Sequence, residues 1–276
     1  MKKTRWLILT TLIIITSLVW LFIWQTTNRG LRVSFLNIGQ GDAIFIEAPN
    51  GNQMLIDGGA GKVVLSELGQ VIPWSDRFID LVVATHPDAD HIGGLYFVLD
   101  RFQIGALLES GVSADTQIYK RLESELITNQ VPQILARRGM KVILDKDVTF
   151  TVLYPDQDTT KMETNDASIV GRLEYKGTSF YLNGDSPLKV ENYLTQKDGS
   201  QIQSTVLKVG HHGSRTSTGQ SFLEVVDPVY AVISAGKNNR YGHPHPEVVE
   251  KLENKNIKIL STAEDGRITF KIFPQS

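Results

Sequence analysis

All six histidines of this 276-residue chain lie in three short clusters, and no other feature of the sequence constrains the fold as strongly. They stand at positions 86 and 91, 211 and 212, and 243 and 245. The first two clusters begin where apolar, strand-like runs end, and the third directly precedes a helix-like run. Imidazoles are common metal ligands, and such a concentration is more informative than any single histidine. We therefore expect the fold to bring three distant segments together.

The first cluster belongs to the segment Thr-His-Pro-Asp-Ala-Asp-His-Ile-Gly-Gly at positions 85–94, between a buried strand and a glycine pair that opens a helix. Imidazole and carboxylate groups suit Zn²⁺ or Mn²⁺. Because four such groups within six residues cannot all reach one ion comfortably, the segment predicts two ions. His86 and Asp88 would face one ion, and Asp90 and His91 the other. A polar surface turn is the weaker alternative, since these groups repel one another unless a cation unites them.

Further candidates stand near the ends of later predicted elements. Asp185 follows a strand-like run and could bridge both ions, although a Gly-Asp pair after a strand is by itself usually only a turn. His211 and His212 point apart because they are adjacent, so one would ligate a metal while the other bonds or faces substrate. His243 and His245 lie just before a helix that opens with proline. The N-terminus of that helix would favour anions, including a substrate phosphate.

The rest of the chain alternates between strand-like and helix-like runs, with strands dominant early and a helix–strand alternation late. Asn-Gly at positions 50–51 is a strong hairpin signal. Two sheets between layers of helices would fit this order. The expected strands cover 31–36, 43–47, 53–56, 81–85, 148–154, 169–175, 179–182, 205–209, 229–233, 257–260 and 268–272, and the expected helices cover 116–129, 188–196, 222–226 and 246–254.

An unbroken uncharged run at positions 6–24 predicts a membrane-spanning helix. Nineteen residues span roughly 28 Å as a helix, close to the ~30 Å hydrocarbon core of a bilayer. Tryptophans near its ends suit the membrane interface, namely Trp6, Trp20 and Trp24. Two lysines and an arginine precede the run, which places the N-terminus in the cytoplasm and the rest outside. We predict an anchor and linker at 1–30 and an extracytoplasmic catalytic domain at 31–276. Cleavage of a signal peptide, giving a secreted protein, is the alternative.

Composition limits the chemistry further. The net charge is -2, and the chain carries no globally basic footprint for nucleic acid. A phosphate-bearing substrate would have to be attracted locally, for instance by bound metal ions. The absence of cysteine excludes disulfides, thiolate zinc sites and a cysteine nucleophile. Polar and basic residues in or beside the motif loops could contact phosphates, although each basic residue alone is more often a solvated charge. These candidates are Lys208, Ser214, Arg215, Lys237 and Arg240.

The motif His86-x-Asp88-x-Asp90-His91 resembles the metal motif of the metallo-β-lactamase superfamily, with aspartate in place of the usual second histidine. Together with Leu-Asn-Ile-Gly-Gln-Gly-Asp-Ala at 36–43, His-His-Gly-Ser at 211–214 and the block at 239–246, it closely resembles the extracellular hydrolase domain of the ComEC/Rec2 competence proteins. The resemblance runs from about residue 33 to residue 273.

The resemblance implies an αββα sandwich with a dinuclear metal site between its sheets, and an activity that degrades the DNA strand that is not imported. The implied metal ligands are His86, Asp88, Asp90, His91 and Asp185, with Asp57 as a buried acid that supports the metal loop. To these we add His211 and His245 as ligands. Asp88, His212 and His243 are the candidates for proton transfer. Which histidine of each later pair ligates is left open.

Departures from the family pattern lie in three places. The superfamily usually supplies a third histidine between the main motif and the bridging aspartate, and none lies between positions 91 and 211. The nearest match begins at Asn165, so Ser168, Asp166 or a water would fill that position. Asn37 stands where relatives often have aspartate. The multi-helix channel region of the competence proteins is missing, so DNA import would need a separate channel protein.

Three functions are compatible with these residues. The first is a membrane-anchored nuclease or phosphodiesterase that uses two divalent ions, Zn²⁺ or Mn²⁺. The second is a hydrolase of small esters, lactones or lactams on the same fold, because a fold does not determine chemistry. The third is a non-catalytic anchored binding module, which the cluster of costly polar groups disfavours. DNA or another phosphodiester is the expected partner in the first case.

Overall fold

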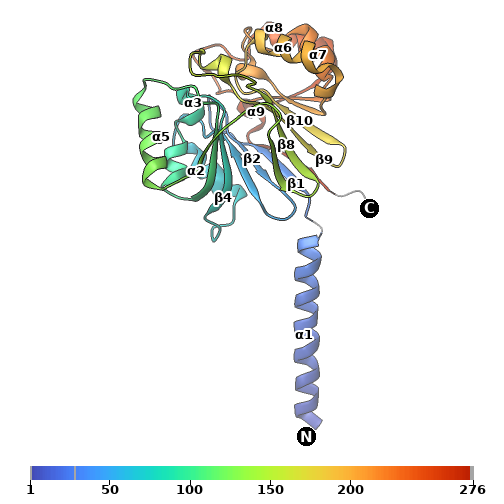
Figure 1. Ribbon diagram of the computed structural model, residues 1–276. Coiled ribbons are helices and arrows are strands. Elements are labelled where there is room, and N and C mark those ends of the chain that lie inside the picture. The colour runs from blue at the N-terminus through green and yellow to red at the C-terminus, as the bar shows by residue number, and fades with distance from the viewer. Residues whose placement is uncertain (1, 28, 274–276) are drawn as a thin grey trace.

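Two seven-stranded β-sheets lie face to face in the computed structural model, which describes residues 2–27 and 29–273 (Figure 1). The first sheet has the order β14-β1-β2-β3-β4-β5-β6. Its strands are β1 (Leu31–Phe35), β2 (Ile44–Glu47), β3 (Gln53–Ile56), β4 (Phe78–Ala84), β5 (Gln103–Glu109), β6 (Gln133–Leu135) and β14 (Ile268–Ile272). The second sheet has the order β13-β12-β11-β10-β9-β8-β7. Its strands are β7 (Lys141–Asp145), β8 (Val148–Tyr154), β9 (Val170–Tyr175), β10 (Thr178–Leu182), β11 (Val206–Lys208), β12 (Tyr230–Ile233) and β13 (Lys258–Ser261).

Helices cover the outer face of each sheet. The first sheet packs against α2 (Val63–Val71), α4 (Leu95–Leu99) and α5 (Gln117–Thr128), and the second against α6 (Leu188–Asp198), α7 (Gln220–Val226) and α8 (Pro246–Asn254). Two short helices, α3 (Ala89–Ile92) and α9 (Thr262–Asp265), lie in the connections. Side chains such as Phe35 and Phe150 fill the central layer between the sheets. The expected αββα sandwich is thereby confirmed.

The strand directions place the metal motif at one end of the sandwich. β1, β3, β4 and β5 run in the same direction, because β2 is antiparallel to β1 and to β3, while β4 and β5 continue parallel. β10 to β13 are parallel to one another in the second sheet. Loops that follow parallel strands meet at one edge of a sheet, where ligands commonly bind. The chain enters β1 at the opposite end, so the N-terminal helix and the motif loops lie at opposite ends.

The N-terminal helix, α1 (Lys2–Thr27), extends away from the sandwich (Figure 1). The window Lys3–Trp20 has a mean hydropathy of 1.3, and none of it is buried against the sandwich. The helix is therefore long and apolar enough to cross a membrane. Trp24 was expected near the membrane interface, and its side chain lies outside the described residues.

Several elements of the first sheet and its helix layer were not expected from the sequence. α2 is one of them, and it buries Val64, Leu68 and Val71. These residues follow the helical spacing of i, i+4 and i+7, but two valines at its start and Gly69 weaken the helical signal. β5 was missed as well. In contrast, α5 begins directly after Thr116, whose hydroxyl caps it by accepting from the Tyr119 amide at 3.2 Å.

Candidate metal centre

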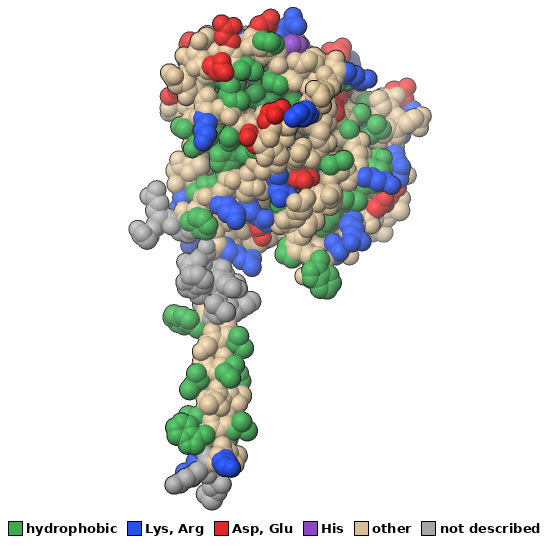
Figure 2. Space-filling view, turned by 180° about the vertical axis from the view of Figure 1, so that it is seen from behind, with side chains coloured by type: hydrophobic (Ala, Val, Ile, Leu, Met, Phe, Trp, Pro, Cys, Tyr) green, Lys and Arg blue, Asp and Glu red, His purple; other side chains and the backbone are tan. Residues whose placement is uncertain are grey.

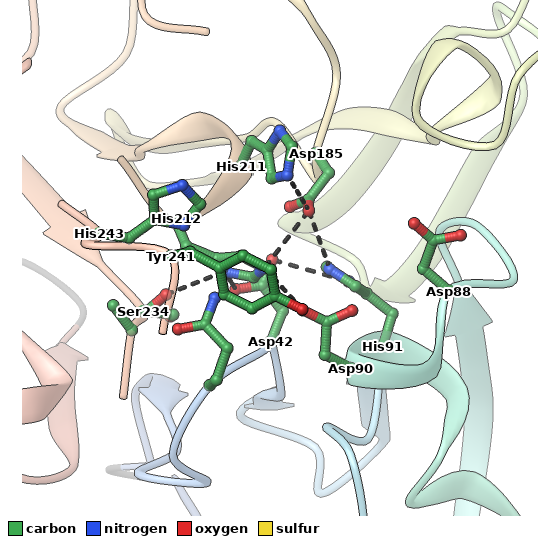
Figure 3. Close-up of polar contacts among 12 residues, drawn as sticks. Asp42, Asp88, Asp90, His91, Asp185, His211, His212, Ser234, Tyr241 and His243 are labelled. Carbon is green, nitrogen blue, oxygen red and sulfur yellow. Dashed lines mark hydrogen bonds and ion pairs between the residues drawn. The ribbon is translucent and has the colours of Figure 1, made fainter. Parts of the chain in front are cut away.

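Asp185 lies at the centre of the polar cluster, three residues after the end of β10, and is buried (Figure 3). Its Oδ2 atom lies 3.2 Å from His91 Nε2, 3.3 Å from His212 Nε2 and 3.7 Å from His211 Nε2. Together with Asp42, the first two of these imidazoles and Asp185 offer four ligand atoms, all within 4.8 Å of one another. One carboxylate oxygen that faces three imidazoles is the arrangement expected of a metal-binding or metal-bridging group.

The free ring nitrogens support a cation at this position. Among the described residues, Nε2 of His86, His91 and His212 is buried without a hydrogen-bond partner, although two of them lie close to Asp185. The other ring nitrogen is held in each case. His212 Nδ1 bonds to the Ser234 carbonyl at 2.9 Å. Leaving such buried groups unsatisfied is costly, and a divalent cation would satisfy them. These residues therefore fit a metal ion.

Asp57, the acid that the resemblance implied as a support of the metal loop, contacts that loop through its carboxylate. It stands at the end of β3, and its carboxylate accepts from the Thr85 amide at 2.8 Å and the Thr85 hydroxyl at 2.7 Å. Its Oδ2 also lies 2.8 Å from His91 Nδ1. This carboxylate–histidine contact orients the ring so that Nε2 points into the cluster. His86 Nδ1 contacts the same Thr85 hydroxyl at 3.0 Å.

The predicted halves of the metal motif lie side by side. His86 Nε2 is 3.6 Å from Asp88 Oδ2, while Asp90 Oδ2 is 3.4 Å from His212 Nε2. The His86 and His91 rings are only 4.1 Å apart between centroids, so the two groups adjoin. Asp88 stands apart from the dashed network of Figure 3, and its side chain is 37% exposed. The geometry is thus compatible with two neighbouring ions and keeps one carboxylate open to solvent.

Asp42 joins the cluster, although sequence reasoning gave it no role. It lies in the loop between β1 and β2, and its amide donates to the Asp90 carbonyl at 3.2 Å. The loop approaches closely because Gly41, at φ +117°, faces that same carbonyl, and a Cβ there would lie 2.0 Å from it. An acidic residue just before a buried strand was the available signal, since such a carboxylate needs a partner when buried.

Lys208 does not contact solvent, so its expected contact with substrate phosphates is wrong. Its side chain is fully buried in β11, where Nζ donates to the Gly184 carbonyl at 2.9 Å. It also forms an ion pair with Asp42 and lies 3.5 Å from Asp185 Oδ1. Burial opposes its charge, yet Asp42 and Asp185 raise the pKa of Lys208. The ammonium group balances the carboxylates of the cluster.

The cluster carries opposite charges in close contact. Burial lowers the pKa of His91, but the nearby Asp185 and Asp57 outweigh this effect and raise the pKa well above its usual value. Asp185 and Asp42 do the same to the pKa of His212, again against the effect of burial. Metal ligation requires neutral imidazole, so ions would displace these protons on binding.

The histidine pair at 211–212 lies on a tight turn after β11. His211 and His212 have φ values of 46° and 55°, and this left-handed region is uncommon for residues other than glycine. The turn lets His212 point into the cluster, while His211 Nδ1 contacts Thr216 Oγ1 at 3.0 Å. Backbone of this kind persists only where the surroundings enforce it. His212, expected in proton transfer, thus lies among the ligands.

The last histidine pair lies farther out. The His243 ring is 5.6 Å from that of His211 and 6.3 Å from that of His212. Burial and these neighbouring histidines lower the pKa of His243 to about 4, so the ring is neutral near pH 7. His245, expected to be a ligand, lies 4.9 Å beyond His243, and its Nδ1 accepts from the Arg215 amide at 3.1 Å. The structure does not include it among the four converging groups.

The segment at η1 (Asn165–Ala167) borders the site where the usual third histidine is missing. Ser168 is buried, and its hydroxyl lies 3.4 Å from the Asp185 amide, which donates to it. Asn165 Oδ1 is buried and, among the described residues, has no partner. Asp166 forms an ion pair with Lys189 instead of facing the cluster. Asp166, one of the alternatives for the missing third histidine, therefore points toward the surface and not toward the cluster.

The remaining candidates differ in their surroundings. Arg215 is exposed, but the Ser214 hydroxyl is buried and bonds within its own loop to Thr216. Lys237 is exposed and lies 3.5 Å from Glu264. Among the described residues, neither the Ser214 hydroxyl nor Lys237 Nζ contacts a carboxylate or imidazole of the cluster. The expectation that Ser214 binds substrate is therefore not supported by its position.

An aromatic stack that sequence reasoning missed lies at the mouth of the site. Tyr241 stacks on His243 with ring centroids 5.6 Å apart and an angle of 21° between planes. The Arg240 guanidinium lies 4.8 Å from the Tyr241 ring and donates to its hydroxyl at 2.6 Å. Figure 3 shows Tyr241 in front of the cluster. An exposed ring and a cation thus stand beside the candidate ligands.

Glu191 secures the loop that carries His212, and it too was missed. It is fully buried in α6 and accepts from the Thr218 amide at 2.8 Å, the Gly219 amide at 2.9 Å and Asn183 Nδ2 at 2.8 Å. Asn183 stands two residues before Asp185, so one carboxylate ties together both loops of the site. The only sequence signal was an acid on the apolar face of a helix.

We expect Glu191→Ala to lower the free energy of unfolding by about 3 kcal/mol, because it leaves three buried donors without an acceptor. Urea unfolding followed by circular dichroism measures the loss. Glu224→Ala on α7, which removes an exposed acid, is the matched control and should stay within about 0.5 kcal/mol of the parent. A loss no greater than that of the control would contradict the clamping role.

The same variant tests the ionisation of Glu191. Burial raises its pKa from 4.5 to about 7, although its hydrogen bonds favour the charged form. The native state therefore binds the proton more tightly than the unfolded chain, and this stabilisation is lost as pH rises from 4.5 through about 7. The stability gap between the parent and Glu191→Ala should narrow over that interval. A widening gap would mean that the hydrogen bonds outweigh burial.

Comparison with known proteins places this geometry in context. The model of the metallo-beta-lactamase superfamily matches residues 36–237. ComE operon protein 3 of Bacillus subtilis (strain 168) is 33% identical, over 91% of this chain and 34% of that protein. Competence protein ComA of Neisseria gonorrhoeae is 30% identical, over 86% and 32% of the two chains. The chain thus spans about a third of the length of these curated relatives.

Solved structures agree on the architecture. CmlA, a diiron β-hydroxylase from Streptomyces venezuelae, has a TM-score of 0.57 at 12% identity, over 88% of this chain and 54% of that one. Zn²⁺-bound PqqB from Methylobacterium extorquens has a TM-score of 0.53 at 10% identity, over 84% and 88%. At such identities the likeness shows the fold alone.

Proposed function

This chain belongs to the metallo-beta-lactamase superfamily, and on that premise we propose that it is a metal-dependent phosphodiesterase that cleaves DNA outside the cytoplasm. The observation that carries the proposal is that ligand atoms of His91, His212 and Asp185 lie close together. The Nε2 atoms of the two histidines are buried and have no hydrogen-bond partner among the described residues. The likeness to competence proteins supports DNA as the substrate. We further propose that α1 anchors residues 31–276, the catalytic domain, in the cell membrane.

Two sets of residues would hold two divalent ions, Zn²⁺ or Mn²⁺. His86 and Asp88 would hold one, and Asp90, His91 and His212 the other, with Asp185 as a further ligand. When bound, such ions would polarise the phosphoryl group and stabilise the charge that develops on it. His211 would complete the set from the side of Asp185.

Proton transfer falls to the residues at the rim of the cluster. His243 lies at this rim, and among the described residues its Nδ1 is buried without a hydrogen-bond partner, so this nitrogen is available for exchange of a proton with a substrate. Asp88 is open to solvent and could carry a proton to or from the leaving oxygen. These roles need no movement of the buried ligands.

The surroundings of the site suit a nucleotide chain. Tyr241 offers an exposed ring on which a base could stack, and Arg240 beside it could contact a phosphate. A surface pocket of about 650 Å³ adjoins η1, and its lining includes two tyrosines and two lysines but also three acids, so it adds no net positive charge. Stacking of single bases favours single-stranded over double-stranded DNA. A separate DNA-uptake channel protein is a further proposed partner.

The proposal is tested by loading the full chain with Mn²⁺ or Zn²⁺ and following cleavage of single- and double-stranded DNA. We expect metal-dependent cleavage that falls about 10³-fold in Asp90→Ala. Asp100→Ala, which alters an exposed acid after α4, should retain it. Bound metal without DNA cleavage, together with turnover of a small ester or lactone, would reject the nuclease. A chain that binds no metal would point to a binding module.

A further inference from the structure

The end of the sandwich opposite the metal centre is held near the anchor helix. Three residues separate the end of α1 from the start of β1 at Leu31. Six residues, 25–30, follow the uncharged run of α1, and even fully extended they span at most about 21 Å. If α1 spans the bilayer, as proposed above, this end of the domain must lie close to the membrane surface.

The loop that leads into β4 lies at this same end. β4 runs in the same direction as β1, so Phe78, the first residue of β4, lies at the end where Leu31 begins β1. In Figure 1 the loop below β4 projects from the same end of the domain as α1. The view from behind in Figure 2 likewise has hydrophobic side chains at the lower tip of the domain, beside the helix.

This loop presents an indole to water. Trp74 is 85% exposed, which makes it the most exposed of the large apolar side chains described, and Phe78 is 44% exposed. For a tryptophan outside α1 such exposure is unusual, because indoles in globular domains are normally largely buried. The loop side chains next to them include the exposed Arg77.

Hydrogen bonds fix the backbone of this loop, so the exposure of Trp74 does not result from a flexible backbone. The Asp76 amide donates to the Pro73 carbonyl at 2.9 Å, which closes a tight turn with Trp74 at its corner. The Asp76 carboxylate accepts from Gln53 Nε2 at 2.7 Å and from the Phe78 amide at 3.1 Å. A turn fixed from both sides therefore points Trp74 outward.

We propose that this loop, residues 73–78, is a second membrane contact that inserts Trp74 into the lipid interface. Tryptophan favours the interface, where its ring is apolar and its N–H can reach water or headgroups. Arg77 would meet anionic headgroups. The inference rests on the anchoring proposed for α1, and it would fix the tilt of the domain with the metal centre facing away from the bilayer.

The test uses the absence of native cysteine. Ser75→Cys in the loop and Ser113→Cys after β5 are both exposed, but Ser113 lies at the metal-centre end. Each full-length variant is labelled with an environment-sensitive fluorophore and reconstituted into vesicles of phosphatidylcholine and phosphatidylglycerol. We expect a blue shift and quenching by nitroxide lipids at position 75 and neither at position 113. Adding Trp74→Ser should abolish both effects at position 75.

Flotation of the vesicles separates the two ways of failing. A chain that floats with the vesicles but leaves the probe at Ser75 as hydrated as that at Ser113 overturns the loop contact while retaining the anchor. Equal signals with and without Trp74 would overturn the role of the indole. A chain that does not float with the vesicles rejects the anchor, and the loop contact is rejected with it.

Discussion

Asp185→Asn is expected to remain folded, to lose bound metal and to reduce hydrolysis by at least about 10³-fold. The change keeps the shape of the side chain but removes the charge that faces His91, His211 and His212. A neutral amide is a weak ligand for Zn²⁺ or Mn²⁺. Because this one oxygen faces three imidazoles of the cluster, the loss of its charge should lower the metal content per chain.

Metal content per chain, measured after dialysis, reports the effect independently of any substrate. Asp166→Asn is the matched control, because Asp166 is the alternative acid near the site and pairs with Lys189. It should keep both the metal and the activity. If Asp166→Asn loses metal while Asp185→Asn retains it, the ligand assignment is wrong. Circular dichroism of both variants shows whether the fold has survived.

Much of this fold could be predicted from local sequence patterns. The ranges of β3, α8 and β14 agree with the expected ones, since hairpin signals, an initial proline and apolar alternation determine them locally. The family resemblance, confirmed by the superfamily match, supplied the arrangement of the sheets. α2 and β5 were missed because glycine and β-branched residues blur the helical and strand periods there.

The site was only partly predictable, because burial depends on tertiary structure. His91, His212 and Asp185 carry a recognisable residue type and spacing. Asp42 has only the weak signal of its place before a buried strand, and the local sequence does not distinguish the ion pair that it forms with Lys208 from surface charges. Lys208 was therefore assigned to substrate, whereas it lies fully buried below the cluster.

A second large effect is expected at this buried ion pair. In metal-free protein, Lys208→Met should lower the free energy of unfolding by about 3–5 kcal/mol, because it leaves Asp42 and Asp185 buried without their shared cation. Methionine fills a similar volume, so the loss would report charge more than packing. Lys120→Met, at an exposed lysine on α5, should change stability by less than about 1 kcal/mol.

Added metal should largely repair the variant. Divalent ions bring positive charge to Asp185 and its neighbours, so they can replace the balance that Lys208 supplies. Removing the lysine also removes a like charge that opposes the ions. The rise in melting temperature on addition of Zn²⁺ should therefore be larger for Lys208→Met than for the parent chain. An equal loss of stability with and without metal would mean that Lys208 supports packing, and that its ammonium does not stand in for the charge of the ions.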